Sequence, residues 1–128
     1  MLHGVNEILL YAGSLILVIW GVAHIVPTRI VVDSFGEISE SNRQIITMEW
    51  IGSGLTLIFL GLLVFAITVF DYAASPAAIV AYRMAALMLI TRSILISFTG
   101  ARTPVVQAKI CPFIEGLAAK LIFIDTLI

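Results

Sequence analysis

Four ionisable residues lie within otherwise apolar stretches of the chain: His24, Glu49, Arg92 and Glu115. A charged side chain at membrane depth costs roughly 2.5–3.5 kcal/mol on insertion scales, so each such group is expected to be paired or functional. An imidazole and a carboxylate can exchange protons near neutral pH, and a guanidinium can bind an anion. The sequence therefore predicts a polar pocket in which His24 and Glu49 exchange protons and Arg92 binds an anion.

The apolar blocks around these residues predict helices that cross a lipid bilayer. Of the 128 residues, 61% are hydrophobic and 12% are charged, whereas a soluble domain has about 45–50% apolar and about 25% charged residues. Blocks of about 20 apolar residues match a hydrocarbon core about 30 Å thick. We therefore predict an all-α membrane protein, a single domain formed by a bundle of four transmembrane helices. The spans are expected at about 5–26, 44–70, 77–99 and 110–128.

Prolines, serines and a glycine mark the expected ends of these spans. Pro27 closes the first span, and Ser39 or Ser41 is placed to cap the second. Pro76 suits the first turn of the third helix, which Gly100 ends.

The basic residues between the spans predict an orientation. The linker 28–43 and the loop 101–109 fall on one side of the membrane, and they hold Arg29, Arg43, Arg102 and Lys109. The opposite tail and turn hold no Lys or Arg, so the positive-inside rule places the linkers in the cytoplasm and both termini outside. Glu7 stands where a signal peptide would be basic, which favours a retained first helix. A prokaryotic plasma membrane is expected because the sequence shows no organelle signal.

The four polar residues are expected to converge at the cytoplasmic half of the bundle. A rise of about 1.5 Å per residue puts Glu49 and Arg92 at similar depth, with His24 and Glu115 shallower. Glu49 shares a helix face with small and hydroxylic residues that line helix contacts in membranes, namely Gly52, Ser53 and Thr56. An alternative reading is structural: Arg92 pairs with Glu49 or Glu115 only to hold the helices in register.

A second set of charges lies in the outer half of the spans and is interpreted as structural. It comprises Glu7, Asp71, Arg83, Lys120 and Asp125. Arg83 is expected to form an ion pair with Glu7 or Asp71. Lys120 can extend its stem toward an interface.

Aromatic residues and glycines complete the expected helix contacts. Trp20 and Trp50 are placed as anchors at the membrane interface. Four glycines are expected to allow close helix approach: Gly13, Gly21, Gly54 and Gly61.

Several classes of function are excluded by what the sequence lacks. No Lys or Arg cluster could neutralise a nucleic-acid backbone. Cys111 is the single cysteine, which excludes an internal disulfide and a Cys-x-x-Cys motif and favours an inert thiol. His3 and His24 are expected at opposite faces, so a two-histidine haem is disfavoured, and no metal site is predicted. No catalytic motif is present, so enzymatic activity stays open and no cofactor is assigned.

The first helix ends in Gly21-Val-Ala-His24-Ile-Val-Pro27, and this ending, the chain length and the four-span layout resemble small DoxX-like membrane proteins. Some members of that group are associated with quinone-linked or sulfur-linked redox systems, but the resemblance assigns no functional residue to this chain. The stretches Phe35-Gly-Glu-Ile-Ser and Thr99-Gly-Ala-Arg-Thr-Pro are also distinctive.

Together these features predict a membrane protein with a polar pocket for a small amphipathic molecule such as a lipid or quinone. Membrane lipids are the expected surroundings. Two alternatives are an accessory subunit of a larger complex and a small proton-coupled carrier that works as a homo-oligomer.

Overall fold

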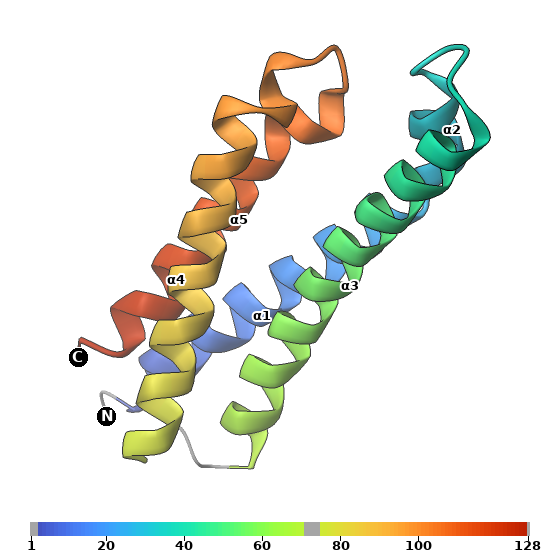
Figure 1. Cartoon of the computed structure of the whole chain (residues 1–128). Helices are drawn as coiled ribbons and strands as arrows, with labels where there is room; N and C mark the ends of the chain where they lie inside the picture. The colour runs from blue at the N-terminus through green and yellow to red at the C-terminus, as the bar shows by residue number, and fades with distance from the viewer. Residues whose placement is uncertain (1–2, 71–74, 128) are drawn as a thin grey trace.

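The computed structural model describes residues 3–70 and 75–127, with side chains from Glu7 onward, and the described chain is helical without strands (Figure 1). Six helices follow one another: α1 (His3–Ile25), α2 (Thr28–Asp33), α3 (Glu40–Val69), α4 (Pro76–Phe98), the 3-10 turn η1 (Gly100–Arg102) and α5 (Val106–Asp125). The prediction of an all-α chain is confirmed for this part of the molecule.

Three of these helices are long and apolar enough to cross a membrane: Glu7–Ile25, Glu40–Val69 and Pro76–Arg102, which includes η1. This finding supports the prediction of a membrane protein. Helix α5 does not meet the same standard within the described residues, because it carries Lys109, Glu115, Lys120 and Asp125. Its crossing of the membrane stays a prediction.

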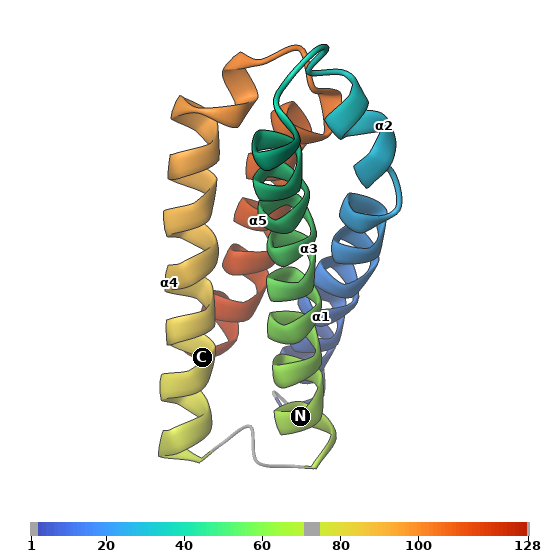
Figure 2. The same ribbon diagram turned by 45° about the vertical axis from the view of Figure 1, so that its right-hand side comes forward.

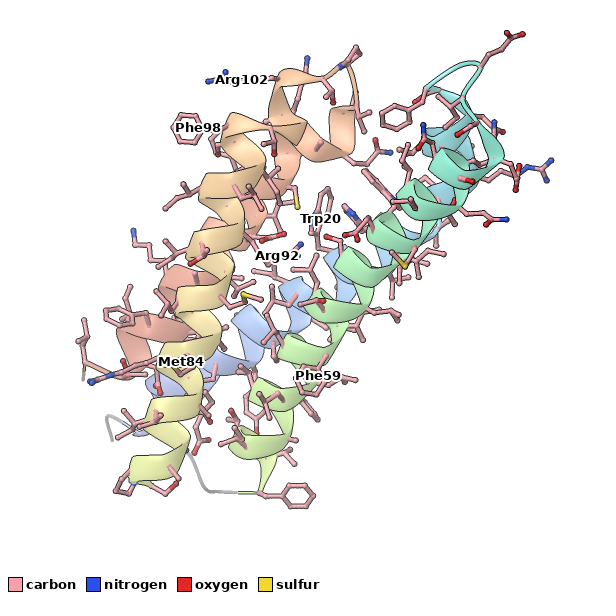
Figure 3. All side chains as sticks on the ribbon, in the orientation of Figure 1. Trp20, Phe59, Met84, Arg92, Phe98 and Arg102 are labelled. Atoms are coloured by element: carbon pink, nitrogen blue, oxygen red, sulfur yellow. The ribbon has the colours of Figure 1, made fainter. Side chains whose placement is uncertain are left out.

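The outer surface of the helices is apolar, as a lipid-facing surface requires. Large hydrophobic side chains such as Phe59, Met84 and Phe98 are about two-thirds exposed, at 63%, 59% and 65%, and Figure 3 shows Phe98 projecting away from the helices. Soluble proteins rarely expose apolar patches of this extent.

Serine side chains cap the N-termini of α3 and α4. Ser39 Oγ accepts a hydrogen bond from the backbone N–H of Asn42 at 3.2 Å, so Ser39 caps α3. Ser75 Oγ accepts from Ala78 N–H at 3.1 Å, and Pro76 stands in the first turn of α4 as expected. Helix α3 begins at Glu40, ahead of the span expected from about 44.

The linker between the first two long helices is itself partly helical. Residues of α2 turn inward, and the Val31 and Val32 side chains are buried. An Arg43–Asp33 ion pair of 2.6 Å ties the end of α2 to the first turns of α3 at the surface. The linker therefore packs on the end of the long helices.

Glycines let α1 and α3 pack closely, as predicted. A Cβ at Gly54 would lie 2.9 Å from the carbonyl oxygen of Gly21 and would also meet Ile25, and a Cβ at Gly61 would lie 2.7 Å from the carbonyl oxygen of Ser14. Backbone atoms cannot yield to such contacts, so these positions require glycine.

The four long helices form two closely packed pairs. Helix α3 packs on α1 and α4 on α5, with α1 also against α5, whereas α3 and α4 contact each other little (Figures 1 and 2). In Figure 1 the two diverge toward the end that carries α2 and η1. At the narrow end, the hydroxyls of Thr68 and Tyr82 are 3.0 Å apart and buried. One side of the bundle therefore opens between α3 and α4.

Candidate functional site

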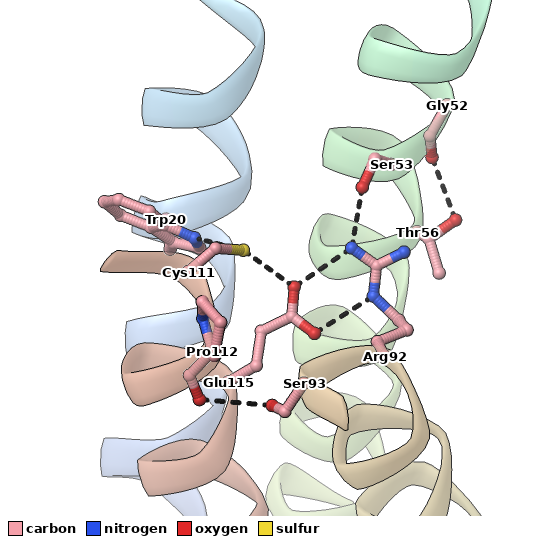
Figure 4. Close-up of polar contacts among 9 residues, drawn as sticks. All are labelled: Trp20, Gly52, Ser53, Thr56, Arg92, Ser93, Cys111, Pro112 and Glu115. Carbon is pink, nitrogen blue, oxygen red and sulfur yellow. Dashed lines mark hydrogen bonds and ion pairs between the residues drawn. The ribbon is translucent and has the colours of Figure 1, made fainter. Parts of the chain in front are cut away.

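A buried ion pair joins α4 to α5 at the centre of the molecule. Arg92 Nε donates to Glu115 Oε2 at 3.1 Å and Arg92 Nη2 donates to Glu115 Oε1 at 3.0 Å, so the contact is bidentate (Figure 4). The Glu115 side chain is fully buried and that of Arg92 is 16% exposed. The sequence left Glu49 and Glu115 open as partners of Arg92, and the structure pairs Arg92 with Glu115.

Further hydrogen bonds extend this pair to all four long helices (Figure 4). Arg92 Nη2 also donates to Ser53 Oγ of α3 at 2.6 Å, across the side where α3 and α4 diverge. The Cys111 thiol donates to Glu115 Oε1 at 3.0 Å, and the indole N–H of Trp20 in α1 donates to Cys111 Sγ at 3.2 Å. Figure 3 shows Arg92 and Trp20 both directed into the space between the two helix pairs. The ion pair is therefore the centre of an inter-helix network.

His24 lies in a stack of aromatic rings beside this network. The His24 and Trp50 rings are nearly parallel at 13°, with centroids 4.1 Å apart, and the Trp50 indole N–H donates to the His24 carbonyl oxygen at 2.6 Å. His24 is only 5% exposed, yet its Nδ1 has no hydrogen-bond partner among the described residues. A buried polar atom without a partner is unfavourable, so a hydrogen-bond donor that reached this nitrogen would stabilise the site.

A cavity of about 390 Å³ opens beside this stack, in the region where α3 and α4 diverge. Its wall combines polar and apolar side chains from the four long helices and η1: His24, Ile45, Ile46, Glu49, Trp50, Ser53, Ile96, Thr99, Gly100, Ala108 and Cys111. Ser53 and Cys111 belong both to this wall and to the network around Arg92. The ion pair therefore lies directly behind the cavity wall.

The structure divides the four predicted pocket residues into two pairs. His24 and Glu49 line the cavity. Arg92 and Glu115 bind each other and do not line it. The Glu49 side chain is exposed and forms no ion pair within the described residues. The cavity wall thus carries one carboxylate and one imidazole, while the guanidinium is already bound.

Four residues in or beside the site were not assigned to it from the sequence: Trp20, Trp50, Ser53 and Cys111. Both indoles are half-buried and donate within the chain, so their prediction as interface anchors misses these inward contacts. Cys111 stands four residues before Glu115, a spacing that puts both on one helix face and could have indicated the contact. Ser53 was expected on the inward face, where it lies.

The outer set of charges is arranged differently from the inner one. Arg83 Nε and Nη2 donate to the hydroxyl and the carbonyl oxygen of Thr126 at 3.3 and 3.2 Å. Glu7 is half-buried, Lys120 is exposed and Asp71 lies outside the described residues, so the ion pair of Arg83 with Glu7 or Asp71 stays a prediction. Asp125 Oδ1 is buried, and no partner for it occurs in the described chain.

Nothing in the described ranges groups three or more His, Cys, Asp and Glu side chains as a metal site would require. Comparison with family models, curated proteins and solved structures finds no match for this chain. The resemblance to DoxX-like proteins therefore stays a prediction.

Proposed function

We propose that all four long helices cross the bilayer and that the protein binds a small amphipathic molecule, such as a lipid or quinone, in the cavity beside His24 and Trp50. The observation that carries this proposal is the cavity itself, a partly polar space at the side where two membrane-length helices diverge. A polar group held there can bind the wall while an apolar tail extends between α3 and α4 into the bilayer.

The fourth crossing is supported by how α5 deals with its charges. Its 20 residues would span about 30 Å at about 1.5 Å per residue, the thickness of a bilayer core. The Glu115 charge is matched by Arg92, whereas Lys109 and Asp125 lie near the two ends of the helix. Lys120 is exposed and its stem can reach toward an interface. These placements remove the main objection to burying α5 in lipid.

The cavity has the size and composition of a small-molecule site. Such sites measure about 300–1,000 Å³ and combine apolar walls with a few convergent polar groups. Here the apolar side chains Ile45, Ile46 and Ile96 surround the polar groups of His24 and Glu49.

The basic residues of the linkers suggest how the protein is oriented in the membrane. Arg29, Arg43, Arg102 and Lys109 lie at the end of the molecule that carries α2, η1 and the wide part of the α3–α4 gap. Under the positive-inside rule the cavity belongs to the cytoplasmic half and both termini lie outside, in a prokaryotic plasma membrane.

A second candidate is an accessory subunit of a larger membrane complex. The weak contact between α3 and α4 leaves one side of the bundle open, and a helix of a partner could cover it in place of a ligand. A stoichiometric partner that copurifies with the protein would favour this candidate.

Native mass spectrometry of the protein released from its membrane tests the pocket directly. Ile96 lines the cavity, whereas its neighbour Leu95 is 62% exposed on the outer surface. Ile96→Trp should fill the cavity and remove a bound small molecule that wild type and Leu95→Trp both retain. A bare mass for wild type, or full retention by Ile96→Trp, would contradict the proposal.

A further inference from the structure

We infer that the cavity selects an amphiphile with a cationic head group, such as an ammonium. This inference rests on the proposed function and narrows it, because a lipid or lipid-like amine then fits better than a neutral quinone. It reverses the sequence-based expectation that Arg92 would bind an anion. Three features of the site carry it: the state of Arg92, the position of Glu49 and the aromatic stack.

The Arg92 guanidinium is already bound within the chain through three of its five N–H donors. It donates two hydrogen bonds to Glu115 and one to Ser53, and its side chain is 16% exposed. Arg92 is not part of the cavity wall. An anion that captured it would leave the fully buried Glu115 carboxylate without its counter-ion, which is strongly unfavourable.

Glu49 therefore gives the cavity wall its negative charge. Because Arg92 and Glu115 compensate each other, the carboxylate left on the wall is that of Glu49, which forms no ion pair in the part of the chain described. A cationic head group would be attracted to this carboxylate, and an anionic one repelled.

The aromatic stack offers a second, independent feature for the same kind of head group. Trp50 lines the cavity beside Glu49, and indole faces attract ammonium groups. The ring of His24 is stacked on Trp50 and is 5% exposed, yet its Nδ1 lacks a partner among the residues described. A neutral imidazole with its proton on Nε2 would accept a hydrogen bond at Nδ1 from an ammonium N–H.

Amphiphiles that share a dodecyl chain test this selectivity. Wild-type protein in nanodiscs of digalactosyldiacylglycerol, a lipid whose head group carries no ammonium, is titrated with dodecylammonium, dodecyl maltoside and dodecyl phosphate below their micelle concentrations, with empty nanodiscs subtracted. We expect dodecylammonium to bind about tenfold or more tighter than dodecyl phosphate, a conservative figure for one partly screened charge pair.

Two variants assign the preference to one carboxylate. Glu49→Gln should reduce the ratio of the two affinities by about tenfold, since it removes charge and keeps shape. Glu37→Gln removes an exposed carboxylate of the linker that does not line the cavity and should leave the ratio unchanged. Equal thermal unfolding of the variants would show that the fold is intact.

The outcomes separate the inference from the proposed function. Equal binding of the three amphiphiles, or preference for the phosphate, overturns the inference while a loss of binding in Ile96→Trp still supports the pocket. A cation preference that survives Glu49→Gln overturns the assignment to this residue. Binding no greater than that of empty nanodiscs, for every amphiphile, overturns both the inference and the pocket.

Discussion

Arg92 and Glu115 are held together in a place that water scarcely reaches, and this makes them the most sensitive pair in the molecule. Removing one member of a buried ion pair leaves the other uncompensated and costs about 3–5 kcal/mol. We expect Glu115→Ala to lower the free energy of unfolding by about that amount, measured by denaturation in mixed detergent micelles.

A double variant separates a structural role of this pair from other causes. Arg92→Met together with Glu115→Leu removes both charges and should recover most of the lost stability, because two apolar side chains of similar size need no counter-ion. If the losses of the single variants Arg92→Met and Glu115→Leu simply added in the double variant, the two side chains of this ion pair would not interact in the folded protein.

The Cys111 thiol is predicted to matter as a hydrogen-bonding group and not as a nucleophile. It donates to Glu115 and accepts from the Trp20 indole, so Cys111→Ala leaves the N–H of a half-buried indole without an acceptor. A loss of about 1–3 kcal/mol in the free energy of unfolding follows. Cys111→Ser, whose hydroxyl can replace both contacts, should lose clearly less, and equal losses would argue against these bonds.

At the residue scale, the sequence could identify which side chains matter but not how they pair. Depth along the helices brought Arg92 near both Glu49 and Glu115. Which carboxylate Arg92 contacts depends on how each helix is rotated about its axis. Packing determines that rotation, and hydropathy does not predict it. For the same reason Trp20 and Trp50 were expected at the interface, although their indole N–H groups are bonded inside the chain.

Among the elements, α1 and α3 meet at a contact that depends on glycine. A Cβ at Gly54 would approach the Gly21 carbonyl oxygen to 2.9 Å, whereas a Cβ at Gly52 meets nothing within 4 Å. We expect Gly54→Ala to destabilise the protein by about 1–3 kcal/mol through overpacking. The matched Gly52→Ala should be neutral or stabilise by up to about 1 kcal/mol, since alanine favours helices.

Thermal unfolding of both variants in the same detergent checks this pair of predictions. Similar melting temperatures for Gly54→Ala and Gly52→Ala would mean that α1 and α3 are farther apart than described.

Hydropathy was a good guide to the existence of the long helices and a poorer guide to their ends. Helix α3 begins at Glu40, because Ser39 caps a polar first turn that can lie outside hydrocarbon. Helix α5 begins at Val106, although its span was expected from about 110. An apolar block marks the part of a helix that faces lipid, and a helix can continue beyond it.

For the whole molecule, the basic residues of the linkers predict an orientation in the membrane, with the linkers in the cytoplasm and both termini outside. In a Cys111→Ser background, a single cysteine at position 37 should react with a membrane-impermeant maleimide only after the cells are permeabilised. A cysteine at position 126 should react in intact cells, because both termini are expected outside. The reverse pattern would invert the proposed topology.

The division of the molecule into two helix pairs could not be predicted from the sequence. Close approach of α1 and α3 follows from Gly21 and Gly54, which were identified. No comparable signal indicated that α3 and α4, which follow each other in the chain, would diverge toward the end that carries η1. The cavity arises from that divergence, so its shape and its lining were accessible only from the structure.

The proposed function requires this partly polar cavity to lie within a membrane and to open toward acyl chains. Trp20→Phe leaves Trp50, on the cavity wall, as the remaining tryptophan of the chain. Its fluorescence in bilayers can be titrated with phosphatidylcholine brominated along the acyl chains, which quenches on contact. We predict strong quenching by bromines in the upper part of the chains. Quenching by aqueous acrylamide alone, with no response to brominated lipid, would contradict the account.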